Sequence, residues 1–402
     1  MQRKNIKTKV FFFLSLLLPA TLQAQDYLKE VLERMEGIQS ASYSEHTESW
    51  EPSDTLPVFT ATFFVQEYRN PQDTTIGACF AKWDSKDKNR FEEGYDGHIH
   101  ASVYHDDREI VLDDFTVRRL PFRPVTPPFF QYTESILRYV LETTDSITKE
   151  VRETGKTYYI KLTIREENQI EFFGKAFRMP SPPPEFYVEP TSVYEIWIDK
   201  TTRLPYKVSK KMSHNISVHV CLHPRLNPTG LKGFNLYDCF PKGYEIKRKG
   251  EQSARKQPSL EGKPAPGWTL RDADGNSFSL GQVKSRVVLL NLTGIGCGAC
   301  HASIPFLRRL KDRFPPADFE LIAIETWGRP MHSIRNYIAR NQINYRFLEG
   351  SKDLVNDYHT GGAAPYFFLL DEHRVVRKVF YGYSLENSEE AITQAIEELL
   401  RP

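Results

Sequence analysis

Three things are scarce in this 402-residue sequence: cysteine, net charge and, after the first residues, long apolar runs. Five cysteines are too few for a scaffold held together by disulfides. A formal net charge of +1 gives no electrostatic basis for binding nucleic acid. No later segment is apolar enough for a permanent membrane anchor. The sequence therefore indicates a globular protein, and its length predicts two domains.

The first 24 residues have a different composition. Four basic side chains precede the short apolar run Val10–Leu18, and the segment ends at the small residue Ala24. This pattern predicts a secretory signal peptide over residues 1–24, which is too short to remain as a membrane anchor. No cysteine lies at the expected cleavage site, so a lipoprotein anchor is not indicated. We expect the mature protein in the periplasm, where disulfides can form.

A polar, charged stretch divides the remaining chain. Residues 247–259 read KRKGEQSARKQPS, which is typical of an interdomain linker. We therefore predict one domain over residues 25–246 and a second over residues 260–402.

Residues 25–246 have the pattern of an antiparallel β-rich domain with few helices. Apolar residues at helical spacing from Tyr27 to Met35 predict a first helix, and Thr133 is a plausible N-cap for a second helix that ends at Leu141. The run from Met179 to Pro190 contains five prolines and predicts a loop. Alternating segments predict strands at Phe59–Tyr68, Ile99–Tyr104, Thr157–Ile164 and Val193–Ile198.

Two phrases in this region resemble the LolA-like family of periplasmic lipoprotein-binding folds. They are FEEGYDGHIHASVYHDD, which resembles a hairpin of that family, and YEIWIDKTTRLPYKV, which resembles one of its strand–turn–strand units. The resemblance implies a concave half-barrel that could bind a protein or an apolar, lipid-like ligand. It transfers no catalytic residue.

After the linker the sequence alternates between buried strands and amphipathic helices. The predicted order is β, α, β, α, β, β, α, which is the order of the thioredoxin fold. This order predicts an α/β, thioredoxin-like domain. The predicted elements are Val287–Leu292, Cys300–Phe314, Phe319–Glu325, Met331–Asn341, Tyr366–Asp371, Val375–Tyr381 and Ser388–Leu400.

The motif CGAC, residues 297–300, lies at the turn from the first of these strands into its helix. Two thiols separated by two residues at a helix start are suited to disulfide exchange, because the free N–H groups and the helix dipole stabilise a thiolate. Cys297 is therefore the candidate nucleophile, and Cys300, one turn on, is the candidate resolving thiol. No cofactor is required for this chemistry.

The surroundings of CGAC resemble the TlpA and ResA group of thioredoxin-like reductases. The segment GKPAPGWTLRDADGNSFSL resembles the N-terminal hairpin of that group, and Pro305 occupies the position where the active-site helix is usually kinked. Pro365 opens the strand YFFLLD after Gly-Gly-Ala-Ala, where a cis proline is expected. Ala364 and Pro365 would then pair with a bound substrate peptide. The resemblance implies a thiol-disulfide oxidoreductase that acts on protein disulfides and receives electrons from an upstream donor.

Several positions depart from the family pattern. Gly296 replaces a tryptophan, Ser303 replaces a glutamate and Tyr366 replaces threonine or serine, while Asn291 occupies the position of the buried acid in thioredoxin. Glu325, at the end of a central strand, is a candidate replacement acid. A solvated carboxylate at the strand end is the favoured interpretation of that residue.

The other cysteines and several histidines leave alternatives open. Cys221 and Cys239 could form a structural disulfide, and Cys79 would then be a small buried residue. CGACH also matches the attachment string for c-type haem, with His301 as an iron ligand, although a strand before it and αβ order after it favour thioredoxin. We expect His301 to lie on the surface beside Cys300, where partial positive charge would favour a thiolate.

Two further readings concern binding rather than exchange. Copper could be held by the two thiols and a distant histidine, and this part of the sequence contains His332, His359 and His373. None of the three has a spacing that ties it to the thiols, and a peroxiredoxin motif is absent around Cys297. Alternatively, the first domain is the functional part and binds a protein or an apolar ligand, with the redox domain as an auxiliary.

Overall fold

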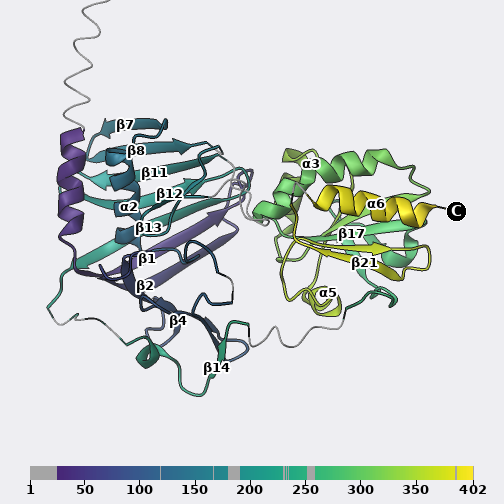
Figure 1. The fold of residues 1–402 in the computed structure, drawn as a ribbon, viewed down its shortest axis with the longest axis horizontal. Helices are drawn as coiled ribbons and strands as arrows, with labels where there is room; N and C mark the ends of the chain where they lie inside the picture. The colour runs from purple at the N-terminus through teal and green to yellow at the C-terminus, as the bar shows by residue number, and fades with distance from the viewer. Residues whose placement is uncertain are drawn as a thin grey trace, which may run out of the picture.

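The computed structural model describes residues 25–401 except residues 118, 166, 180–190, 230, 232, 234, 251–258, 385 and 386. The predicted signal peptide, most of the predicted linker and nearly all of the predicted proline-rich loop lie outside the described residues. The described chain forms two large β-sheets, one before and one after residues 251–258 (Figure 1). Within the described part of the chain, no helix is long and apolar enough to cross a membrane.

The first sheet has 12 strands in the order β14-β6-β5-β4-β3-β2-β1-β13-β12-β11-β8-β7. All neighbours are antiparallel except β14 and β6. The order is that of an open sheet, and the LolA-like half-barrel stays a prediction. The strands are β1 (Ser40–Trp50), β2 (Phe59–Arg69), β3 (Ala78–Asp84), β4 (Phe91–Tyr95), β5 (His100–Tyr104), β6 (Glu109–Asp113), β7 (Thr148–Thr154), β8 (Thr157–Ile164), β11 (Ser192–Asp199), β12 (Leu204–Lys211), β13 (Ile216–Leu226) and β14 (Glu245–Arg248). A separate hairpin is formed by β9 (Ile170–Phe172) and β10 (Ala176–Arg178).

The last strand of this sheet extends into the residues predicted as the linker. β14 pairs in parallel with β6, and its Lys247 contacts the carboxylate of Glu109 across the pair. Lys247 and Arg248 therefore belong to the sheet, although their charge and the neighbouring glycine suggested a linker.

Two helices cover one face of the first sheet. Residues 25–36 are helical, as predicted, and α2 spans Phe129–Glu142. Their apolar sides share one buried core with strand residues such as Val65, Ile160 and Ile196. Because stability rises with the apolar area that is removed from water, this burial should be the main contribution that holds the two helices on the sheet.

The start of α2 differs from the prediction. The helix begins at Phe129, and Thr133 lies inside it, where its hydroxyl donates to the Phe129 carbonyl oxygen at 2.8 Å. The cap is instead supplied by Glu67 of β2, which accepts hydrogen bonds from the N–H groups of Phe130 (3.2 Å) and Gln131 (2.8 Å). Carboxyl oxygens that accept the free N–H groups at a helix N-terminus are favourable, but a contact between distant segments leaves no local sequence signal.

Glu67 leads to a prediction about stability and pH. Burial raises the pKa of Glu67 to about 7, although the Tyr43 hydroxyl and the two N–H groups of α2 oppose the shift. Because the folded state binds this proton more tightly than the unfolded state, the associated stability is complete below about pH 4.5 and is lost as the pH rises towards 7. We expect the unfolding free energy of the parent chain, relative to Glu67→Gln, to fall by about 2–4 kcal/mol between pH 4.5 and 8. Urea unfolding of both chains measures this, and a difference that does not depend on pH would contradict it.

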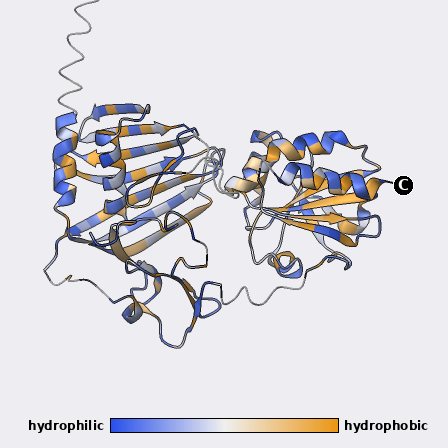
Figure 2. Cartoon of the chain, in the orientation of Figure 1, coloured by the Kyte–Doolittle hydropathy of each residue, from blue (hydrophilic) through white to orange (hydrophobic). Residues whose placement is uncertain are grey.

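The second sheet has seven strands in the order β16-β15-β19-β18-β17-β20-β21. β17 (Val287–Thr293) is buried along its whole length and pairs in parallel with β18 (Phe319–Glu325) and antiparallel with β20 (Tyr366–Leu370). The remaining strands are β15 (Thr269–Asp272), β16 (Ser277–Ser279), β19 (Arg346–Glu349) and β21 (Val376–Tyr381). Figure 2 shows that the central strands are mostly hydrophobic.

Helices on both faces explain why β17 is apolar throughout. One core contains Leu289 together with side chains of α3 (Gly298–Arg313), α4 (Met331–Arg340) and α6 (Ser388–Leu400). The other contains Leu290 together with Leu354 of α5 (Lys352–Asp357) and the residues around β15. Alternate residues of β17 thus face different cores, as in parallel sheets covered on both sides.

The thioredoxin-like order and the predicted β15–β16 hairpin are confirmed. Five of the seven predicted elements differ from the observed ones by one or two residues at an end, and the bounds of β18 and α6 are identical. β19 and α5 were not predicted. Both are short, and β19 is held by its neighbours β18 and β15 rather than by a strong periodic pattern.

Candidate redox site

The two cysteines of CGAC lie at the turn from β17 into α3. Cys297 is the N-cap residue of α3, and its Sγ accepts a hydrogen bond from the Cys300 N–H at 3.2 Å. The two residues form a disulfide with their Cα atoms 5.2 Å apart. The first turn of α3 contains no acidic side chain, so the positive end of the helix dipole acts on Cys297 without local compensation. Cys297 is 9% exposed and Cys300 is 1% exposed, so the first sulfur is the more accessible one.

The loop before β20 brings the other predicted site residues to the same place. The Ala364 carbonyl oxygen lies 3.7 Å from Cys297 Sγ, and the Ala364–Pro365 peptide bond is cis, as expected. β20 runs antiparallel to β17, which is why its start lies beside the end of β17. The structure therefore brings together all four predicted site residues: Cys297, Cys300, Ala364 and Pro365.

Two of the side chains that depart from the family pattern, Ser303 and Tyr366, make defined contacts. Ser303 is completely buried, and its hydroxyl donates to the Cys300 carbonyl oxygen at 2.7 Å. Tyr366 packs against Tyr381 of the edge strand, with ring centroids 4.9 Å apart. Neither side chain offers a carboxylate to the thiols.

Glu325 is a buried carboxylate, which corrects its prediction as a solvated strand-end residue. It is 1% exposed and accepts hydrogen bonds from the N–H groups of Ile295 (3.3 Å), Trp327 (3.1 Å) and Arg329 (2.9 Å). Burial raises its pKa, and the three N–H groups oppose that shift. Glu325 thereby joins the loop that leads into Cys297 to the loop that follows β18.

Trp327, which no sequence motif marks, lies beside the same loop. The ring of Trp327 packs so closely on Gly294 that a Cβ at this position would lie 2.3 Å from the ring. Trp327 Nε1 donates to the Gly362 carbonyl oxygen at 2.9 Å, two residues before Ala364. An aromatic side chain from another loop thus packs on the segment that leads into Cys297, whereas the family pattern has one directly before the first cysteine.

Three cysteines lie outside this site. Cys79, Cys221 and Cys239 are free, so the suggested Cys221–Cys239 disulfide is wrong. Cys221 lies in the core of the first sheet, where neighbouring side chains surround it. Burial raises the pKa of Cys79 and of Cys239 to about 11, which leaves both thiols protonated near neutral pH.

His301 does not have the surface environment that we predicted. Its ring is largely buried, and the burial together with the nearby Arg340 guanidinium lowers its pKa. The lowered pKa disfavours the positive charge that we expected beside Cys300. Among the described residues, no group of three or more His, Cys, Asp or Glu side chains is arranged to hold a metal ion.

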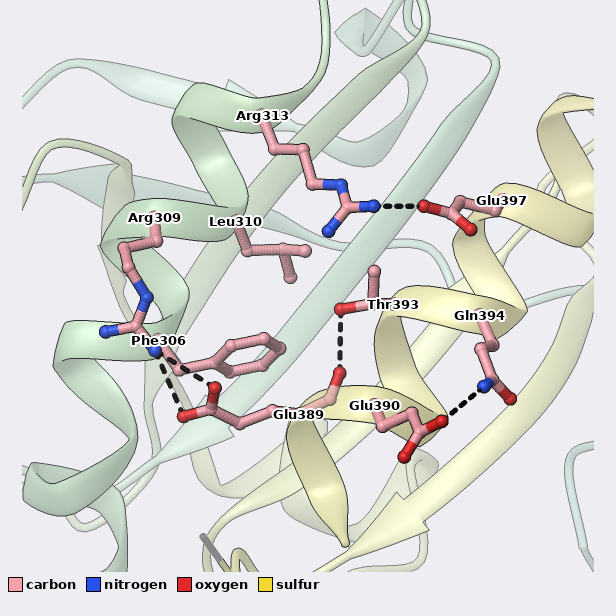
Figure 3. A pocket seen from close by; sticks show the side chains of 9 residues that line it. All are labelled: Phe306, Arg309, Leu310, Arg313, Glu389, Glu390, Thr393, Gln394 and Glu397. Carbon is pink, nitrogen blue, oxygen red and sulfur yellow. Dashed lines mark hydrogen bonds and ion pairs between the residues drawn. The ribbon is translucent and has the colours of Figure 1, made fainter. Parts of the chain in front are cut away.

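A groove of about 480 Å³ lies elsewhere on this domain, between α3 and α6 (Figure 3). Its charged side chains form ion pairs across it, from Arg309 to Glu389 and from Arg313 to Glu397. None of the four predicted site residues lines this groove, so the chemistry is not located there.

Comparison with known proteins defines the class of the second domain. Residues 260–396 match the Redoxin family and form a Redoxin domain. This part of the chain is a thioredoxin-like domain of the thiol-disulfide oxidoreductase class.

Two relatives and one solved structure are similar to parts of this chain. The chain is 25% identical to the thiol-disulfide oxidoreductase ResA of Geobacillus kaustophilus over 121 residues, which cover 30% of this chain and 69% of that protein. It is 25% identical to ResA of Bacillus subtilis over 134 residues, which cover 33% of this chain and 74% of that protein. A solved thiol:disulfide interchange protein from Bacteroides sp. is 22% identical, with a TM-score of 0.30, and its match covers 35% of this chain and 90% of the other.

Proposed function

We propose that this protein reduces disulfide bonds of exported proteins in the periplasm, through Cys297 and Cys300. The observation that carries the proposal is the position of Cys297. It caps α3, receives the Cys300 N–H and lies 3.7 Å from the carbonyl oxygen before cis-Pro365. A thiolate there is stabilised by the helix terminus and lies beside backbone groups that can pair with an extended substrate.

The exchange takes two steps. The Cys297 thiolate attacks one sulfur of the substrate disulfide, that S–S bond breaks, and the other substrate sulfur leaves as a thiolate that takes a proton from water. Cys300 then loses its proton and attacks the Cys297 sulfur, which closes the Cys297–Cys300 bond and expels the second substrate thiolate. Two electrons pass from the dithiol to the substrate, and an upstream dithiol donor restores the reduced pair by the reverse exchange.

The backbone beside the thiols would orient the substrate. Ala364 and Pro365 lie directly before β20, and the Ala364 carbonyl oxygen lies beside Cys297 Sγ. We assign both residues to substrate binding. The first domain, with its open sheet and two covering helices, would recruit a protein or lipid partner, as its LolA-like half-barrel pattern suggests.

A trapping experiment tests this function. In Cys300→Ser the second step cannot occur, so mixed disulfides with Cys297 should accumulate in cells that export the full chain. After rapid alkylation, non-reducing electrophoresis should show adducts that disappear on reduction and that contain exported proteins. The double variant Cys297→Ser/Cys300→Ser is the matched control and should form none. Equal adducts in both variants, or none in either, would refute the proposal.

A further inference from the structure

The first domain contacts the redox domain along one side of α4. Ser333, Asn336 and Arg340 are spaced three and four residues apart, so they lie along one side of the helix. Ser333 and Asn336 both donate to the carboxylate of Asp54, which follows β1, and the Asn336 distance is 2.7 Å. Figure 1 shows that the ends of the first sheet's strands face the side of the second domain that carries α3.

Arg340 fixes two loops of the first domain at once. One guanidinium nitrogen donates to Glu51 at 2.7 Å, and another donates to the Ser213 carbonyl oxygen at 2.6 Å. Glu51 is 1% exposed, and its second oxygen accepts the Ser53 N–H at 2.7 Å. A buried, fully hydrogen-bonded carboxylate paired with arginine is a contact that is costly to break from one side.

The loop that Arg340 holds places a histidine against the CGAC motif. Residues 212–215 connect β12 to β13 and close with a hydrogen bond from the Met212 N–H to the Asn215 carbonyl oxygen at 2.8 Å. His214 in this loop is 7% exposed, and its ring lies 6.2 Å from that of His301. A Cβ at Gly298, the residue after Cys297, would lie 3.3 Å from both Cε1 and Nε2 of His214. The glycine in CGAC thus lies against a loop of the first domain.

We propose that the 212–215 loop is a wall of the substrate site and that His214 selects substrates by size at Cys297. This inference rests on the proposed disulfide exchange and adds a selection step to it, with the chemistry unchanged. Cys297 is barely accessible, and a substrate segment that crosses Gly298 meets the His214 ring. A small disulfide reaches Cys297 without contact with the wall, whereas a bulky folded protein contacts the wall and reacts more slowly.

The wall acts by shape rather than by charge. Burial and the nearby His301, Lys210 and Arg340 lower the pKa of His214 to about 4, so its ring is neutral at pH 7. Removal of the ring should therefore widen access without removing a charge that stabilises the Cys297 thiolate.

Two substrates distinguish this inference from the proposed function. For His214→Ala in the full chain, kcat/KM with insulin should rise at least about threefold, while the value with bis(2-hydroxyethyl) disulfide stays within about twofold. Arg340→Ala, which releases the loop, should also raise the ratio of kcat/KM with insulin to kcat/KM with bis(2-hydroxyethyl) disulfide. Arg335→Ala removes an exposed arginine from the same helix and should leave both rates unchanged.

The outcomes are separable. If the parent chain reduces neither substrate, the proposed function fails. If it reduces both, and His214→Ala and Arg340→Ala leave the ratio of the two kcat/KM values unchanged or lower it, the wall is refuted. Gly298→Ala adds a readout of the contact itself, since its effect on insulin reduction should shrink in the His214→Ala background.

Discussion

Replacing Cys297 with serine should lower the rate of disulfide reduction at least about a thousandfold, because a serine hydroxyl is not ionised near neutral pH and cannot form the mixed disulfide. The surrounding structure should tolerate the change, since the two side chains are nearly equal in size. The assay is insulin reduction with a dithiol donor, followed at pH 7.

The matched control is Cys79→Ser. Burial raises the pKa of the Cys79 thiol to about 11, so this thiol contributes almost no thiolate at pH 7 and its loss should leave the rate within about twofold. Substantial activity in Cys297→Ser, or its loss in Cys79→Ser, would move the nucleophile away from CGAC.

The second large effect is expected at Gly294. A Cβ here would lie 2.3 Å from the Trp327 ring, so Gly294→Ala must displace the tryptophan and weaken its hydrogen bond to Gly362. Overpacking of this kind should reduce the unfolding free energy of the second domain by about 1–3 kcal/mol. Because the Gly362 loop leads to Ala364 and Pro365, disulfide reduction should fall as well.

A double-mutant cycle assigns that cost to the contact. In the Trp327→Ala background, Gly294→Ala should cost less than about 0.5 kcal/mol, because the clash has been removed. Gly267→Ala is the matched control, since a Cβ there would meet nothing within 4 Å. Urea unfolding gives each free energy. An equal cost of Gly294→Ala with and without the tryptophan would show that the close approach does not govern this loop.

The sequence was most informative where the signal was local. The continuous apolar run of β17, the CGAC turn and Pro365 lie within short segments whose spacing fixes their structure, and all were predicted in their observed places. The same holds for α6, whose apolar positions repeat at helical spacing.

Features that depend on contacts between distant segments could not be predicted. Glu67 caps α2 across 63 residues, and this contact leaves no local signal in the sequence. The predicted start of that helix at Thr133 was therefore wrong, since the helix begins at Phe129. Cys221 and Cys239 were a reasonable pair by spacing, yet the first lies in the sheet core and the second ends a short 3₁₀ turn, so the fold keeps both free.

The redox site shows the same limit. Glu325 was noted as a strand-end carboxylate, but its burial depends on two loops that are distant from each other in sequence. Three N–H groups of these loops donate to the buried carboxylate. Trp327 and His214 carried no motif. Their only traces in the sequence are the glycines that accommodate them, Gly294 and Gly298, and a glycine alone does not say which side chain approaches it.

If Cys297 exchanges disulfides with exported proteins, Cys297 is the attachment site in the trapped Cys300→Ser adducts. Peptide mass spectrometry of those adducts should identify Cys297 joined to a cysteine of an exported protein. Attachment through Cys79, Cys221 or Cys239, or adducts made only with cytoplasmic proteins, would contradict the account.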